Sequence, residues 1–167
     1  MLKYTTAEVT FREIPDEVTL CINISNCPIH CPDCHSKELW GDIGEELTEE
    51  KLCSLIEENK GITCICFMGG IQDYAALDRL FLEVHKKHLK TALYSGENVI
   101  PWFIELDYIK IGPYIKERGG LDNPNTNQRF FKKVRHATFT NDGHCSFVLP
   151  GWEDITYKFW RNDTNIS

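Results

Sequence analysis

The feature that most constrains the fold is an alternation of short apolar runs with amphipathic segments of helical spacing. It continues through the first two-thirds of the chain. The apolar runs cover residues 18–24, 62–70, 91–96 and 108–112. The second, ITCICFMGG, is continuously apolar, as expected for a strand buried on both faces. Strands that alternate with helices form βαβ units around a parallel sheet. We therefore expect an α/β fold, a partial (β/α) barrel with a mostly parallel sheet.

Helices are expected after the first three of these strands. Residues 47–61 carry Thr48 as the expected N-cap, with acidic residues in the first turn and leucines on one face. A second helix is expected to begin near Asp73, and a short third one covers 98–106, with a proline in its first turn. The stretch from Phe130 onward contains strand-like pieces whose order the pattern does not fix.

A cysteine triplet follows the first expected strand directly. Cys27, Cys31 and Cys34 stand in CPIHCPDC with the spacing C-x3-C-x2-C. Three thiolates on one loop can hold an iron–sulfur cluster, and such clusters normally take four cysteine ligands. A missing fourth ligand leaves one iron open to a substrate, so this spacing predicts chemistry at the cluster.

Zinc is the alternative ligand for this loop, because His30 or His35 could complete a tetrahedral Cys3His set. No second C-x2-C or H-x3-H pair follows, however, and we favour iron and sulfide. The two histidines could instead donate hydrogen bonds that tune the cluster. The other five cysteines stand in or beside apolar runs and are expected to be core residues: Cys21, Cys53, Cys64, Cys66 and Cys145.

Length and charge limit the remaining possibilities. A chain of 167 residues fits a single domain, residues 1–167. A formal net charge of -7 argues against nucleic acid as a partner, because phosphate binding needs a basic surface. No stretch has the length of a membrane span, and the N-terminus lacks the features of a signal peptide. We therefore expect no membrane association and a cytoplasmic location.

Four expected strand ends carry the remaining candidate residues. The cysteine loop, Gly69-Gly70, Ser95-Gly96 and Gly112-Pro113 each follow a strand. In parallel α/β sheets the carboxyl ends of the strands meet at one edge, where ligands bind. A single cofactor site at that edge explains all four.

The triplet, CHSKELW after it, DYIKIGPY at the fourth strand and NTNQR in the late loop resemble a known family. This is the family of activating enzymes of anaerobic ribonucleoside-triphosphate reductase, within the radical S-adenosylmethionine superfamily. The resemblance extends from about Val18 to Phe131. It implies a radical S-adenosylmethionine type of partial barrel, with a 4Fe–4S cluster on the three cysteines. S-adenosylmethionine would chelate the fourth iron and be cleaved reductively to a 5′-deoxyadenosyl radical.

The implied substrate is a glycine of the large reductase subunit, which loses a hydrogen atom to that radical. The electron would come from an external one-electron donor, flavodoxin-like or ferredoxin-like. The resemblance also implies contacts to S-adenosylmethionine from Asp33, His35, Gly69, Gly70, Ser95, Lys110 and Asn127. Two departures concern these contacts: EIPDEV replaces a Gly-Pro-Gly-Arg stretch, and Ile71 stands at the usual acidic position.

The late loop from Asn125 to Arg129 is expected to line the opening of the site or contact the cosubstrate. Two other readings remain open. One is an activase of a different glycyl-radical enzyme, or a radical enzyme acting on a small molecule. The other is a non-catalytic zinc or iron–sulfur module.

Overall fold

A computed structural model describes residues 1–69, 72–103, 105–139 and 145–160 of the chain. Its helices and strands are, in chain order, β1 (Lys3–Thr10), β2 (Thr19–Ile24), η1 (Lys37–Trp40), β3 (Glu45–Glu46), α1 (Glu49–Glu58), β4 (Cys64–Gly69), α2 (Tyr74–Lys86), β5 (Lys90–Tyr94), β6 (Tyr108–Ile111), η2 (Lys116–Arg118), β7 (Arg129–Phe139), β8 (Cys145–Asp154) and η3 (Thr156–Phe159).

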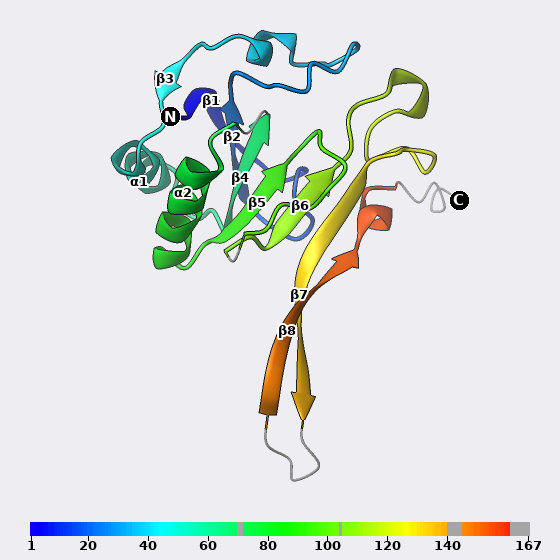
Figure 1. The fold of residues 1–167 in the computed structure, drawn as a ribbon. Coiled ribbons are helices and arrows are strands. Elements are labelled where there is room, and N and C mark those ends of the chain that lie inside the picture. Colours follow the sequence, from blue (N-terminus) through cyan, green and yellow to red (C-terminus); the bar gives the residue numbers. More distant parts are fainter. Residues whose placement is uncertain (70–71, 104, 140–144, 161–167) are drawn as a thin grey trace, which may run out of the picture.

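The strands form one mixed sheet in the order β3-β1-β2-β4-β5-β6-β7-β8 (Figure 1). The four central strands β2, β4, β5 and β6 run parallel to one another. The outer strands are antiparallel, with β1 and β3 at one edge and β7 and β8 at the other. Parallel pairing is therefore confined to the centre of the sheet.

The prediction of a partial (β/α) barrel with a mostly parallel sheet is wrong. Three of the seven strand pairs in the described sheet are parallel, and the described residues contain two α-helices. The reason lies in the connections. A parallel pair needs a crossover, whereas strands joined without one pair antiparallel. No α-helix separates β1 from β2, β6 from β7 or β7 from β8 in the described residues. The sheet therefore ends in antiparallel strands on both sides.

Alternate residues of the central strands face two different cores. Leu20, Ile22, Ile65 and Phe67 face the side where α1 and α2 pack. Figure 1 shows both helices on that same face. The other face buries a second cluster that includes Cys21, Cys64, Cys66, Ala92 and Tyr108. Segments without α-helix cover this second face, through Ile14, Leu121 and Ile155. Three of the five cysteines expected in the core are thus buried; Cys53 is half-buried and Cys145 lies in β8.

Local signals set the helix starts. The Thr48 hydroxyl accepts a hydrogen bond from the backbone N–H of Lys51 at 3.1 Å, and α1 begins at Glu49 as expected. The Asp73 carboxylate accepts from the N–H of Ala76 at 2.9 Å, which caps α2. The helix expected over 98–106 is wrong, because residues 98–103, 105 and 106 are not helical. The proline at 101 disfavours a helical residue before it.

At the far edge of the sheet, β7 and β8 continue beyond the body as a two-stranded arm (Figure 1). Their pairing runs from Phe131 with Asp154 to Phe139 with Cys145, whereas β6 pairs with β7 only over Arg129 to Lys132. On this side the body of the domain thus ends where β6 begins, at Tyr108. The candidate site lies at the opposite, carboxyl end of the parallel strands.

Candidate functional site

The three cysteines of the triplet lie on a loop that folds back on the segment containing η1. The backbone N–H of Asn26 donates to the carbonyl of Gly41, and that of Cys27 donates to Leu39, both at 2.8 Å. Within the loop, the N–H of Cys34 donates to the carbonyl of Cys31 at 2.9 Å, which forms a turn. Backbone hydrogen bonds therefore hold both the start of the loop and the turn that contains the last two cysteines.

The loop is also anchored to the segment that precedes α2. The side-chain amide of Asn26 donates to the Gln72 carboxamide oxygen at 2.9 Å, and Gln72 donates back to the Asn26 carbonyl at 2.6 Å. Asn26 has a positive φ of 61° and His30 one of 47°. Such backbone angles are uncommon for residues other than glycine, and they turn the chain sharply. Both turns direct the loop over the ends of the parallel strands.

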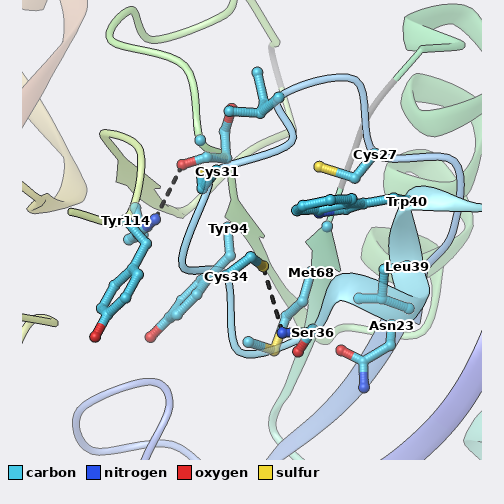
Figure 2. Close-up of a pocket in the computed structure, with 15 residues that line it drawn as sticks. Asn23, Cys27, Cys31, Cys34, Ser36, Leu39, Trp40, Met68, Tyr94 and Tyr114 are labelled. Atoms are coloured by element: carbon cyan, nitrogen blue, oxygen red, sulfur yellow. Dashed lines mark hydrogen bonds between the residues drawn. The ribbon is translucent and has the colours of Figure 1, made fainter. Parts of the chain in front are cut away.

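All three thiols line one cavity of about 160 Å³. Its floor is formed by the ends of the four central strands, from which Asn23, Met68, Gly69, Tyr94, Ser95 and Lys110 line it. Figure 2 shows these walls, with Cys27, Cys31 and Cys34 around the space and Trp40 beside Cys27. Of the four strand ends expected to share one site, the cysteine loop, Gly69 and Ser95-Gly96 line this cavity, whereas Gly112 and Pro113 do not. Lys110 of β6 lines it as well.

The thiols of Cys27, Cys31 and Cys34 are free and half-buried, a state in which a cysteine can act as a ligand. Over residues 1–69, 72–103, 105–139 and 145–160, no three His, Cys, Asp or Glu side chains are placed as a group that could hold a metal ion. The three thiols thus line one cavity without forming such a group in this structure.

Lys110 is the cation of the cavity. Its ammonium donates to the carbonyls of Gly112 at 2.8 Å and Ser95 at 3.3 Å, and no carboxylate among the described residues pairs with it. Burial lowers the pKa of Lys110 from 10.5 to about 8, while the neighbouring Cys31, Cys34 and Cys27 act in the opposite direction. An ammonium held in this way favours an anionic ligand in the cavity.

Trp40 supplies a second donor. Its indole N–H is buried and has no acceptor among the described residues. The residues that line the cavity thus include the Lys110 cation, the Trp40 indole and three potential thiolates, with no carboxylate among them. This donor set fits a cysteine-ligated iron–sulfur cluster, whose sulfurs are negatively charged hydrogen-bond acceptors.

A larger groove of about 810 Å³ opens from the Cys34 side of the cavity. The two spaces share Cys34, Ser36, Tyr94, Lys110 and Tyr114. The groove continues between the segment before β2 and the late loop, and its size is that of a small-molecule site. A ligand in it would therefore lie directly against one of the three thiols.

Charged side chains line the outer part of this groove. Arg12, Glu13 and Asp122 lie there, and burial raises the pKa of Glu13. The Tyr94 hydroxyl donates to the Glu13 carbonyl at 2.5 Å, which ties the segment before β2 to the parallel strands. One wall of the groove is therefore fixed to the floor of the cavity.

The remaining predicted contacts fall in different places. His35 lines the groove, where its ring meets Tyr114 edge-on at 4.7 Å. Asp33 is exposed and lines neither space. Asn127 also lies outside both, and its amide donates to the Pro113 carbonyl at 2.9 Å. Gly70 lies outside the described residues.

The late loop lines the groove in part, as expected. Gln128 belongs to the groove wall, whereas Arg129 does not. The Arg129 guanidinium donates instead to the carbonyls of Thr126 at 3.0 Å and Gln128 at 2.9 Å. Arg129 therefore stabilises the end of the loop rather than facing the site.

Several lining residues were not expected from the sequence. Asn23, Met68 and Tyr94 are each two residues along a strand from a core residue of the second face, and this period-two spacing was available in the sequence. Trp40, the last residue of η1, and Tyr114, in the loop after β6, also line the cavity. No local pattern marks these two, because their positions depend on how the loops fold back.

Comparison with protein-family models, with curated proteins and with solved structures found no match. Within the parts of the chain that the structure describes, no helix combines the length and apolar character needed to span a bilayer.

Proposed function

We propose that this protein is a glycyl-radical-generating activase. It would bind a 4Fe–4S cluster through Cys27, Cys31 and Cys34, and S-adenosylmethionine beside it. The observation that carries the proposal is the single cavity in which three thiols of one loop meet Gly69, Ser95 and Lys110 at the carboxyl ends of four parallel strands.

The chain's own residues would bind and orient the cosubstrate. Lys110 offers an ammonium with no carboxylate partner among the described residues, suited to a carboxylate or to the cluster. Ser95 is buried at the strand end, and its hydroxyl already accepts from the N–H of Glu97 at 3.1 Å, which leaves its own proton to donate. When bound, the cluster and S-adenosylmethionine supply one-electron cleavage chemistry that leads to hydrogen abstraction.

The groove beside Cys34 would admit the substrate. Its volume of about 810 Å³ leaves space for the cosubstrate and for a glycine of the large subunit of anaerobic ribonucleoside-triphosphate reductase. The electron would come from a flavodoxin-like or ferredoxin-like donor. A cluster held by thiolates needs reducing surroundings, so we expect the protein to act in the cytoplasm.

The test is anaerobic reconstitution with iron and sulfide, then reduction, addition of S-adenosylmethionine and chromatography for 5′-deoxyadenosine. The Cys31→Ala variant removes one expected ligand. Cys53→Ala is the matched control, because Cys53 is also half-buried but lies on α1, outside the cavity. We expect release from the wild type and from Cys53→Ala, and none from Cys31→Ala.

Other results would lead to other functions. Protein that holds its cluster but releases no 5′-deoxyadenosine would be an electron carrier or an iron–sulfur module. Uptake of zinc in preference to iron would indicate a structural zinc site. Release of 5′-deoxyadenosine without a glycyl radical signal on the added reductase, measured by electron paramagnetic resonance, would indicate a different substrate.

A further inference from the structure

The indole N–H of Trp40 is a buried donor with no acceptor among the described residues. Leaving such a buried donor without a partner is energetically costly. Trp40 lines the thiol cavity, and the missing acceptor is therefore to be sought in whatever fills this space.

The orientation of the Trp40 ring is set by its neighbours. His30 stacks on it with ring centroids 4.8 Å apart and an interplanar angle of 21°. The Lys37 ammonium lies 5.5 Å from the ring centroid. The backbone on either side of Trp40 is held as well, because the carbonyls of Leu39 and Gly41 accept from the cysteine loop. The ring is thus held by its stacking partner, and the backbone is held on both sides of Trp40. The orientation of the indole is therefore fixed.

The potential acceptor of the cavity that lies beside this donor is the Cys27 sulfur. Cys27 adjoins Trp40, since its N–H bonds to the residue immediately before Trp40 (Figure 2). The other charged group in the cavity, Lys110, is itself only a donor. Thiolate and sulfide sulfurs of a bound cluster accept hydrogen bonds, and such bonds influence its reduction potential.

We propose that the Trp40 indole N–H donates a hydrogen bond to a sulfur of the iron–sulfur cluster and thereby raises its reduction potential. The inference rests on the proposed function, because it requires a cluster on the three cysteines. Reduction adds negative charge to the sulfurs, and a fixed donor stabilises the reduced state more than the oxidised one. Trp40 would contact the cluster directly and tune its potential, without taking part in the bond cleavage.

The test compares Trp40→Phe with the wild type after reconstitution with iron and sulfide, in the absence of S-adenosylmethionine. Phenylalanine keeps an aromatic ring for His30 to stack on and removes the N–H. Trp102→Phe is the matched control, because Trp102 is 89% exposed and lies outside the cavity. Iron content is measured first, and the midpoint potential is then measured by redox titration.

We expect all three proteins to bind the same amount of iron, and the midpoint potential to fall only in Trp40→Phe. An unchanged potential in Trp40→Phe would overturn the inference. If the potential is unchanged and Trp40→Phe binds S-adenosylmethionine more weakly, the acceptor of the indole N–H is the cosubstrate and the inference is refuted. If Trp40→Phe binds no iron, Trp40→His is measured instead. Recovery of the cluster with a ring N–H present supports the inference, and failure to recover it refutes it.

Failure of the proposed function has a different outcome. In that case the wild type itself would take up no iron, or would hold a cluster and release no 5′-deoxyadenosine. Failure of the inference leaves both properties of the wild type intact, so the wild type alone distinguishes the two failures.

Discussion

Replacing Lys110 by methionine should stabilise the metal-free protein. The ammonium lies in the thiol cavity with two carbonyls as its hydrogen-bond acceptors and no carboxylate partner among the described residues. Burial lowers its pKa from 10.5 to about 8, which means that folding disfavours the charged form. Methionine has a similar length and no charge, so the substitution removes this cost and keeps most of the packing.

The magnitude follows from the pKa. At about 1.4 kcal/mol per pKa unit, a fall from 10.5 to about 8 corresponds to ~3 kcal/mol. Between these two values the unfolded chain binds more protons at Lys110 than the folded one, so wild-type stability rises with pH. The advantage of Lys110→Met is therefore complete below about pH 8. It shrinks to under ~1 kcal/mol by about pH 10.

The assay is urea unfolding of metal-free protein at pH 7 and pH 10, under reducing conditions. Lys60→Met is the control, because Lys60 is exposed and the same change there should alter the free energy of unfolding by less than ~0.5 kcal/mol. A Lys110→Met variant that is less stable than the wild type at pH 7 would refute the reasoning. It would mean that the ammonium stabilises the empty site through its two carbonyl contacts.

Two further predictions concern positions around the sheet. Gly69→Ala should destabilise the fold by at least ~3 kcal/mol, because the added Cβ would lie 2.2 Å from the Ile24 carbonyl oxygen. Gly61→Ala, also at positive φ but in open space, should cost only ~1–2 kcal/mol by urea unfolding, and equal costs would contradict the clash. Glu17→Gln should cost ~2–3 kcal/mol at pH 7, because Glu17 is 4% exposed and pairs with Lys90, which is half exposed. Burial opposes ionisation of Glu17, but its hydrogen bonds from Lys90, Thr63 and Tyr108 outweigh it and lower its pKa. Wild-type stability should consequently fall below about pH 4.5 in a way that Glu17→Gln does not share, and parallel pH profiles would contradict this.

The parts of the fold that the sequence predicts are those set by local chemistry. Thr48 and Asp73 cap their helices because a short polar side chain lies directly before an amphipathic segment. The central strands follow from apolar runs separated by those helices. Strand direction at the sheet edges was not predictable in this way, because it depends on the shape of irregular connections. The chain between β6 and β7 contains only a short 3-10 helix, η2, and its turns reverse the direction of the strand.

The residues of the candidate site likewise include some that the sequence predicts and others that it does not. The cysteine loop, Gly69 and Ser95 were predicted to share one edge because each lies at the end of an expected parallel strand, and such ends meet. Lys110 was expected at the site by resemblance. Asn127 was placed at the cosubstrate by resemblance, whereas its amide bonds the Pro113 carbonyl and stabilises a turn. Trp40 was missed, because its place in the cavity depends on backbone bonds between Leu39 and Cys27 that no periodicity encodes.

Trp40 and Lys110 are both buried donors that a ligand accepting hydrogen bonds would stabilise. Each places a hydrogen-bond donor in the thiol cavity under conditions that disfavour the empty state, one as an unpartnered N–H and the other as a poorly solvated ammonium. A ligand that accepts from both binds the folded protein and not the unfolded chain, and its binding free energy then adds to stability. The effect of Lys110→Met on stability should for this reason depend on whether the site holds its ligand. The variant should be more stable than the wild type without metal and should gain less stability from reconstitution with iron and sulfide. Equal gains in the two proteins would show that the cation does not act on the bound group.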